Sequence, residues 1–260
     1  MTLEALVLVV AVLGGLASGT VGIGGGAIVV PGLVYLPAVL GVRPLGIDQV
    51  SGLSIVLVGA ASLLGGALHH RQAKADRRVV LAVGVPLIGT GILAALASAS
   101  LPDAVSIVAL ALMASAAALL LVRPRAGVRE ESRDRGFRAG AAAGVGGLVG
   151  AGSGLLGAGG AWLLLPLLTD VVRVPIRTAI TSSLVVTSIA SVGIIAGKLL
   201  TDQVPLEYVP WGLLGVLPAA ALSVRLSHRL PAAVLRRILA VIVLVIAVRA
   251  WADALSLFVG

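Results

Sequence analysis

The chain has 260 residues, of which 59% are hydrophobic and 12% charged, and its mean hydropathy is +1.14. Since an average soluble domain is about 25% charged and needs polar residues over its exposed surface, this composition excludes a water-soluble globule. The net charge of +8 does not indicate a nucleic-acid partner, because only 3% of the residues are aromatic and bases would find few side chains on which to stack.

Ten apolar segments follow one another along the chain, and four of them reach the length of about 20 residues that a transmembrane helix needs. Two others, 27–41 and 160–172, are short, and each follows a cluster of glycines. We expect half-helices or re-entrant hairpins there, with a short span across a locally thinned bilayer as the alternative. The long segments are 48–68, 79–100, 178–200 and 231–257, and the remaining ones are 3–19, 104–122, 137–155 and 207–225.

Lys and Arg residues gather in three of the loops, at 69–78, 123–138 and 225–237. Because short cytoplasmic loops of membrane proteins carry an excess of Lys and Arg, we expect these three loops to be cytoplasmic. The loops near Pro102 and at 201–206 carry no Lys or Arg and should face outside. Counting segments from these loops places both termini outside as well.

The chain also repeats itself, with one block recurring at an offset of 135 residues and a second at 131. The polar stretch 123–136 then links a first membrane repeat, 1–122, to a second, 137–260. Each repeat holds about five segments, an odd number, so the second copy is inverted in the membrane. We therefore predict an all-α polytopic membrane protein of two inverted repeats, a recurring design of secondary transporters. The matched residues are Ser18, Gly19, Gly22, Gly24, Gly25 and Pro31 with Ser153, Gly154, Gly157, Gly159, Gly160 and Pro166, and Pro44, Ser51, Leu53 and Gly66 with Pro175, Ser182, Leu184 and Gly197.

The two glycine motifs are the first candidates for a binding site. Glycine interrupts a helix at low steric cost and leaves backbone N–H groups open to a ligand, and the start of the next helix favours an anion. The alternative is close helix packing, because Gly15/Gly19 and Gly150/Gly154 are also GxxxG pairs. The predicted substrate-binding glycines are Gly22, Gly24, Gly25, Gly26, Gly157, Gly159 and Gly160.

Hydroxyl residues on the long segment after each short one are the second group of candidates. Ser51 in the first repeat and Thr181, Ser182 and Ser183 in the second are predicted to bind the substrate, with Ser51 and Ser182 beside the same anion and Ser182 the more important. The alternative is that each hydroxyl bonds back to a carbonyl of its own helix. Lys198 lies near a span end, so we expect it to attract the anion without coordinating it.

Acidic residues lie near the predicted ends of the spans, which argues against a cation site, a metal site or a carboxylate proton relay. The three histidines, His69, His70 and His228, fall in basic loops, and Gly152-Ser153-Gly154 lacks the spacing of a serine nucleophile. We expect no catalytic residue, no metal and no cofactor.

The glycine motifs that lead to Pro31 and Pro166, together with the block from Pro175 to Leu184, resemble the TauE/SafE family of membrane permeases, also called sulfite exporters. The resemblance covers almost the whole chain. It implies a bacterial or archaeal inner-membrane transporter of small sulfur-containing or organic anions, such as sulfite, sulfonates or sulfoacetate, and hence periplasmic termini. The block from Pro44 to Leu53 departs from the Ala-x-x-Thr-Ser pattern of the second repeat.

The sequence thus predicts a secondary transporter that moves a small anion by alternating access, with its site at the interface of the repeats. Its partners are the anion and the lipid bilayer, and it is a monomer or a homodimer. One alternative is a transporter of a neutral metabolite or a metal ion. The position of the acidic residues disfavours the metal ion. Another is a membrane scaffold without transport activity, for which two interrupted helices aimed at each other would be unnecessary.

Overall fold

The computed structural model describes residues 2–21, 25–69, 75–122, 138–226, 244–245 and 247–255, and within them every regular element is a helix. Four of the described helices are long and apolar enough to cross a membrane, which confirms the prediction of an all-α polytopic protein. The segment 231–257 lies mostly outside the described residues, and the linker 123–136 wholly so. The helices are α1 (Leu3–Val21), α2 (Gly26–Leu40), α3 (Ile47–His69), α4 (Arg77–Ser98), α5 (Asp103–Val122), α6 (Ala139–Leu156), α7 (Ala161–Asp170), α8 (Ile176–Leu200) and α9 (Val209–Leu226), and residues 247–255 are helical as well.

The two segments that follow the glycine clusters are short helices, as predicted. Helix α2 has 15 residues and α7 has 10, which correspond to roughly 22 Å and 15 Å at 1.5 Å per residue. Both lengths fall short of a hydrocarbon core of about 30 Å. Each helix also contains proline at the matched position, Pro31 in α2 and Pro166 in α7.

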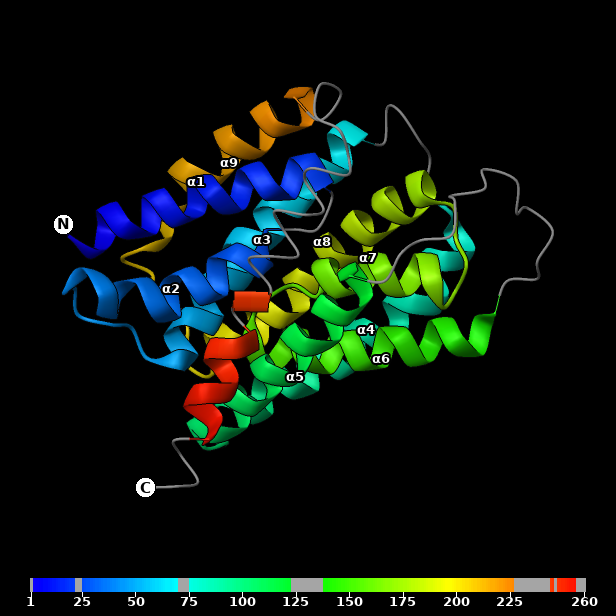
Figure 1. Cartoon of the computed structure of the whole chain (residues 1–260). Helices are drawn as coiled ribbons and strands as arrows, with labels where there is room; N and C mark the ends of the chain where they lie inside the picture. The colour runs from blue at the N-terminus through cyan, green and yellow to red at the C-terminus, as the bar shows by residue number, and fades with distance from the viewer. Residues whose placement is uncertain are drawn as a thin grey trace.

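Helices from the two halves of the chain pack together in pairs. Helix α1 runs along α9, α4 runs along α6, and α3 packs on α8, and Figure 1 shows α1 beside α9 and α4 beside α6. Helix α9 therefore joins the group formed by α1, α2 and α3, whereas α4 and α5 join α6, α7 and α8. The contact between α3 and α8 connects the two groups.

Glycines allow α1 to approach α9 closely, and α6 to approach α4 closely. A Cβ on Gly15 would meet the carbonyl of Val216 in α9, and one on Gly150 would meet the carbonyl of Leu87 in α4. Gly154, one turn after Gly150, lies in the same way against Gly91. These glycines allow the close helix packing that small residues permit in membranes. This is the alternative that their GxxxG spacing indicates.

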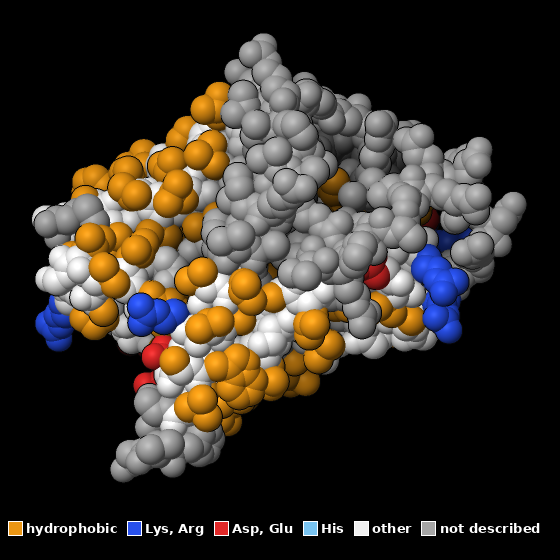
Figure 2. All heavy atoms as spheres, in the orientation of Figure 1, with side chains coloured by type: hydrophobic (Ala, Val, Ile, Leu, Met, Phe, Trp, Pro, Cys, Tyr) orange, Lys and Arg blue, Asp and Glu red, His pale blue; other side chains and the backbone are white. Residues whose placement is uncertain are grey.

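The outer surface is largely apolar. Val39 and Leu200 are 76% and 81% exposed, and large apolar side chains are exposed along α4, α8 and α9 as well. Figure 2 shows hydrophobic side chains over most of the coloured face, with Lys and Arg toward its two ends. Such a surface suits contact with lipid chains, because a soluble monomer rarely exposes an apolar patch larger than a few hundred Å².

Candidate functional site

Two glycines in the left-handed conformation begin the short helices. Gly25 precedes α2 with φ of 73°, and Gly160 precedes α7 with φ of 61°. A side chain is excluded at both positions, because a Cβ on Gly25 would meet the backbone of Gly14 and a Cβ on Gly160 would meet the side chains of Val149 and Ser153. The matched glycines therefore have the same role in both halves of the chain, since each forms the left-handed turn before a short helix.

Each of these turns leaves backbone donors at the start of its helix. The carbonyl of Gly25 accepts the N–H groups of residues 28 and 29, and that of Gly160 accepts those of residues 163 and 164. The N–H groups that precede these bonds have no partner within the helix, and the aligned peptide dipoles make the helix start partially positive. Both helix starts can therefore donate hydrogen bonds to an anion.

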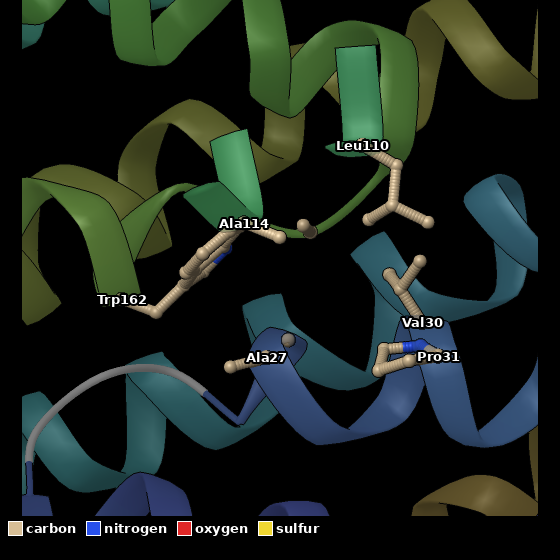
Figure 3. A pocket seen from close by; sticks show the side chains of 8 residues that line it. Ala27, Val30, Pro31, Leu110, Ala114 and Trp162 are labelled. Atoms are coloured by element: carbon tan, nitrogen blue, oxygen red, sulfur yellow. The ribbon is translucent and has the colours of Figure 1, made fainter. Parts of the chain in front are cut away.

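The structure brings the two helix starts together. Gly26 lies so close to Ala158 that a Cβ on the glycine would meet the carbonyl group of the alanine. Residues from both motifs line one small apolar cavity (Figure 3), which leaves about 10 Å³ of free space, enough for about one water molecule. The lining residues are Gly26, Ala27, Val30 and Pro31 from α2, Leu110 and Ala114 from α5, and Ala158 and Trp162 from the second motif and α7.

Trp162 supplies an unpaired donor at this cavity. Its side chain is only 3% exposed, and its indole Nε1 has no hydrogen-bond partner. In Figure 3 the ring points toward Ala114, with its nitrogen on the edge that faces the other lining residues. Buried polar groups in proteins are nearly always paired, and this N–H is available to donate to a polar group in the cavity. The glycine and hydroxyl patterns of the sequence do not single out Trp162, which stands two residues after Gly160.

Among the described residues, three hydroxyls are also buried without a partner, and one of them lies beside a motif glycine. Thr187, 1% exposed, has no hydrogen-bond partner for its Oγ1, and its methyl group lies beside Gly159. Ser18 in the last turn of α1 and Ser62 on α3 are also buried without a partner. An unpaired buried hydroxyl costs about 1–3 kcal/mol, so Thr187, beside Gly159, fits a site that receives polar groups.

The predicted site residues divide into two groups. Gly25, Gly26, Gly157, Gly159 and Gly160 lie where the two motifs meet, whereas Gly22 and Gly24 lie outside the described residues.

Ser51 belongs with these glycines. Its Oγ donates to the carbonyl of Leu155 at 2.8 Å, and its own carbonyl lies against Gly157.

The other predicted hydroxyls lie elsewhere. The Ser182 Oγ accepts the N–H of Asp76 at 3.1 Å, and the Ser183 Oγ donates to the carbonyl of Ile180 at 2.9 Å in its own helix. Thr181 is buried on the same helix.

The expectation that Ser51 and Ser182 flank one anion is corrected by this geometry. Helices α3 and α8 are antiparallel, with Gly59 beside Ser191 and Gly66 beside Leu184. Ser182 therefore lies near the level of Leu68, which is 17 residues and roughly 25 Å along α3 from Ser51. Matched residues of two antiparallel helices meet only where the helices cross, and these two serines lie on opposite sides of that crossing.

Lys198 is buried and hydrogen-bonded within the protein, although its position near a span end predicted otherwise. It is 0% exposed, and its Nζ donates to Gln203 Oε1 at 2.6 Å, to Ser98 Oγ at 2.7 Å and to the carbonyl of Leu155 at 3.4 Å. Ser51 donates to the same carbonyl, so the ammonium shares a hydrogen-bond partner with a predicted site residue. The sequence shows that Lys198 lies near a span end, but it does not show the polar partners that α4 and the 201–206 loop supply.

Among the residues that the structure describes, no three His, Cys, Asp or Glu side chains cluster as metal ligands do. The donors around the glycine motifs are instead backbone N–H groups, the indole of Trp162 and hydroxyls. This set suits a negatively charged ligand.

Comparison with known proteins places the chain in a family. The model of the family described as "Sulfite exporter TauE/SafE" matches residues 7–250 of the 260. No curated protein matches the chain, and no solved structure does. The long apolar helices and this match, which covers nearly the whole chain, show a multi-pass membrane protein that belongs to the sulfite exporter TauE/SafE family of membrane permeases.

Proposed function

We propose that this protein is a secondary transporter that moves a small sulfur-containing or organic anion, of the sulfite, sulfonate or sulfoacetate type, across the inner membrane by alternating access. It has no catalytic role in this proposal. The observation that carries it is the cavity lined by both glycine-led helix starts, with the unpaired N–H of Trp162 at its wall. Family membership supports transport, and the donor set supports an anion.

The energetics explain why both helix starts are needed. An isolated ion in hydrocarbon faces a penalty of tens of kcal/mol, whereas one helix terminus contributes at best about 2 kcal/mol. Hydrogen bonds to a charged group add about 1.5–3 kcal/mol each. Two termini, the indole N–H, nearby hydroxyls and water together can hold an anion for the time that transport requires.

The packing of the helices supports two inverted repeats, 1–122 and 137–260, that exchange helices to form two groups able to move against each other. If α1 to α5 correspond to α6 and the elements after it, the pair α1 and α9 corresponds to α6 and α4, and these are the two long parallel contacts. The pair α3 and α8 corresponds to itself and forms the contact between the two groups. A rocking motion about this contact would open the cavity, which is too small for a sulfite ion in the present conformation, to one side and then the other.

Reconstitution tests the proposal directly. The purified full-length protein is placed in liposomes, and the uptake of sulfite, methanesulfonate, acetate and the uncharged dimethyl sulfone is measured. We expect uptake of at least one sulfur-containing anion, saturable with concentration, and no uptake of dimethyl sulfone. Uptake of neutral compounds alone would favour the neutral-metabolite alternative, and no uptake of any compound would favour a scaffold.

A further inference from the structure

Lys198 is a fully buried cation whose hydrogen-bond partners are all uncharged. It lies two residues before the end of α8 and connects this helix to Ser98 at the end of α4, to Leu155 at the end of α6 and to Gln203. Removing an ammonium from water costs several kcal/mol even after relaxation, and neutral acceptors repay this cost only in part. The charge of Asp48, a half-buried residue at the start of α3, also acts on the ammonium.

The hydrogen bonds of Lys198 leave one side of the ammonium weakly held. An ammonium group has three N–H donors. Two of them make short bonds, to Gln203 and Ser98, while the third reaches the carbonyl of Leu155 at 3.4 Å, which is beyond the usual range for an N–H···O bond. That carbonyl already accepts the Ser51 hydroxyl at 2.8 Å. The third N–H, on the side of the carbonyl that Ser51 also bonds, is therefore left without a short acceptor of its own.

We propose that Lys198 is the fixed positive charge that the transported anion binds, through an oxygen placed between its Nζ and the Ser51 hydroxyl. This inference rests on the proposed function and assigns a residue to it that the glycine motifs do not contain. An anionic oxygen is a stronger acceptor than the Leu155 carbonyl, because hydrogen bonds between ionised partners are shorter and about twice as strong as neutral ones. It would also balance a buried charge that the protein leaves without a bonded carboxylate.

The position of Lys198 fits a step of the transport path. Leu155, which its ammonium contacts, is three residues before Ala158 at the wall of the cavity. The other two partners lie at the end of α4 and in the loop at 201–206, which loop charge predicts to face outside. An anion that moves between the outer face and the cavity would pass the ammonium, and the short bonds to Gln203 and Ser98 hold Nζ in place for it.

The first test changes the charge of Lys198. Binding of sulfite and of methanesulfonate to the purified full-length protein is measured by thermal shift at constant ionic strength, with dimethyl sulfone as the uncharged analogue. Lys198→Gln should lower the affinity for both anions by about tenfold to a hundredfold, the range expected for one lost bond to a charged group. Lys198→Arg keeps the charge and should lose less. Lys74→Gln, at the other lysine of the chain, is the matched control and should bind as the parent does.

The second test neutralises Lys198 without replacing it. Gln203→Glu places a carboxylate where Oε1 now accepts the ammonium at 2.6 Å, so the protein supplies its own counter-ion. Anion affinity should fall at least tenfold while the melting temperature stays the same or rises. Gln203→Met, of similar length and uncharged, removes the bond that holds Nζ without adding a counter-ion, so it should lower anion affinity less than Gln203→Glu does, even if the protein melts earlier. If Lys198 only connects helices, Gln203→Glu should leave anion affinity unchanged, because the new ion pair would keep the helices connected.

The outcomes separate the two proposals. If the parent protein binds and transports sulfite or methanesulfonate and both Lys198→Gln and Gln203→Glu bind the anions as tightly as the parent, Lys198 is not the counter-charge and the proposed function stands. If Lys198→Gln does not insert, Gln203→Glu decides by the same criterion. If the parent responds to no anion in the panel, the proposed function fails and the role of Lys198 fails with it.

Discussion

The backbone of Gly26, the first residue of α2, lies directly against the carbonyl group of Ala158 in the second glycine motif. These residues are 132 positions apart in the chain, and the contact brings the two interrupted helices of the two halves to one cavity. It tolerates no side chain at Gly26. The approach of two backbones, each interrupted by glycine, is therefore the structural relationship on which the proposed anion site depends.

Gly160→Val should abolish transport and destabilise the protein. Valine tolerates a positive φ poorly, which costs about 1–3 kcal/mol, and its Cβ would in addition meet Val149 and Ser153. Gly41→Val is the matched control, because Gly41 has a similar φ of 66° but open space around it. Sulfite uptake and melting temperature are measured for both variants. Normal uptake by Gly160→Val would remove the glycine motif from the mechanism.

Trp162→Phe should weaken anion binding by about tenfold or more, since it removes one hydrogen bond to a charged group and keeps most of the ring that lines the cavity. The stability of the protein should stay the same or increase, because the indole N–H is buried without a partner. Trp211→Phe is the control at a tryptophan that is 43% exposed. Equal affinity of Trp162→Phe and the parent, measured by thermal shift with sulfite, would show that the indole N–H does not meet the ligand.

The short helices could be predicted from the sequence because their causes are local. Glycine clusters and the prolines at 31 and 166 are visible in the chain, and the structure has left-handed glycines and short helices at both places. The repeat offset also pointed to equivalent roles for Gly25 and Gly160, and both begin a short helix in the same way.

Relations between distant segments could not be predicted from the same patterns. The burial of Lys198 depends on Ser98 and Gln203, which reach it from the end of another helix and from a loop. The separation of Ser51 from Ser182 depends on where α3 crosses α8, which a repeat offset does not specify. Sequence symmetry shows which residues are equivalent, but equivalence by an inverted repeat places most pairs far apart.

Ser51→Ala should affect anion binding more than Ser182→Ala, the reverse of the order that the fuller motif around Ser182 favoured. Ser51 lies beside Gly157 and shares the carbonyl of Leu155 with Lys198, so its loss should lower sulfite affinity by about tenfold. Ser182 bonds the N–H of Asp76, and its loss should lower the free energy of unfolding by about 1 kcal/mol with little effect on affinity.

Ser54→Ala is the control for these two variants. Its hydroxyl donates to the carbonyl of Val50 in its own helix, so removing it should change neither property much. Sulfite titrations and thermal melts of the three variants decide the order. A larger loss of affinity in Ser182→Ala than in Ser51→Ala would contradict the assignment of Ser51 to the site and restore the order predicted from the motif.

Loop charge predicts that residues 123–136 are cytoplasmic and that both termini are periplasmic, and this arrangement underlies the inverted repeats. The chain contains no cysteine, so single cysteines introduced as Thr2→Cys, Glu130→Cys and Phe258→Cys can be labelled without background. A membrane-impermeant maleimide should label the first and the third in intact cells, and the second only after the inner membrane is permeabilised. Arginines at six positions between 123 and 138 oppose transfer of this linker to the outside. Labelling of Glu130→Cys in intact cells with neither end labelled would mean that the whole bundle is oriented the other way, and the route from the outer face to Lys198 would then begin at the cytoplasm.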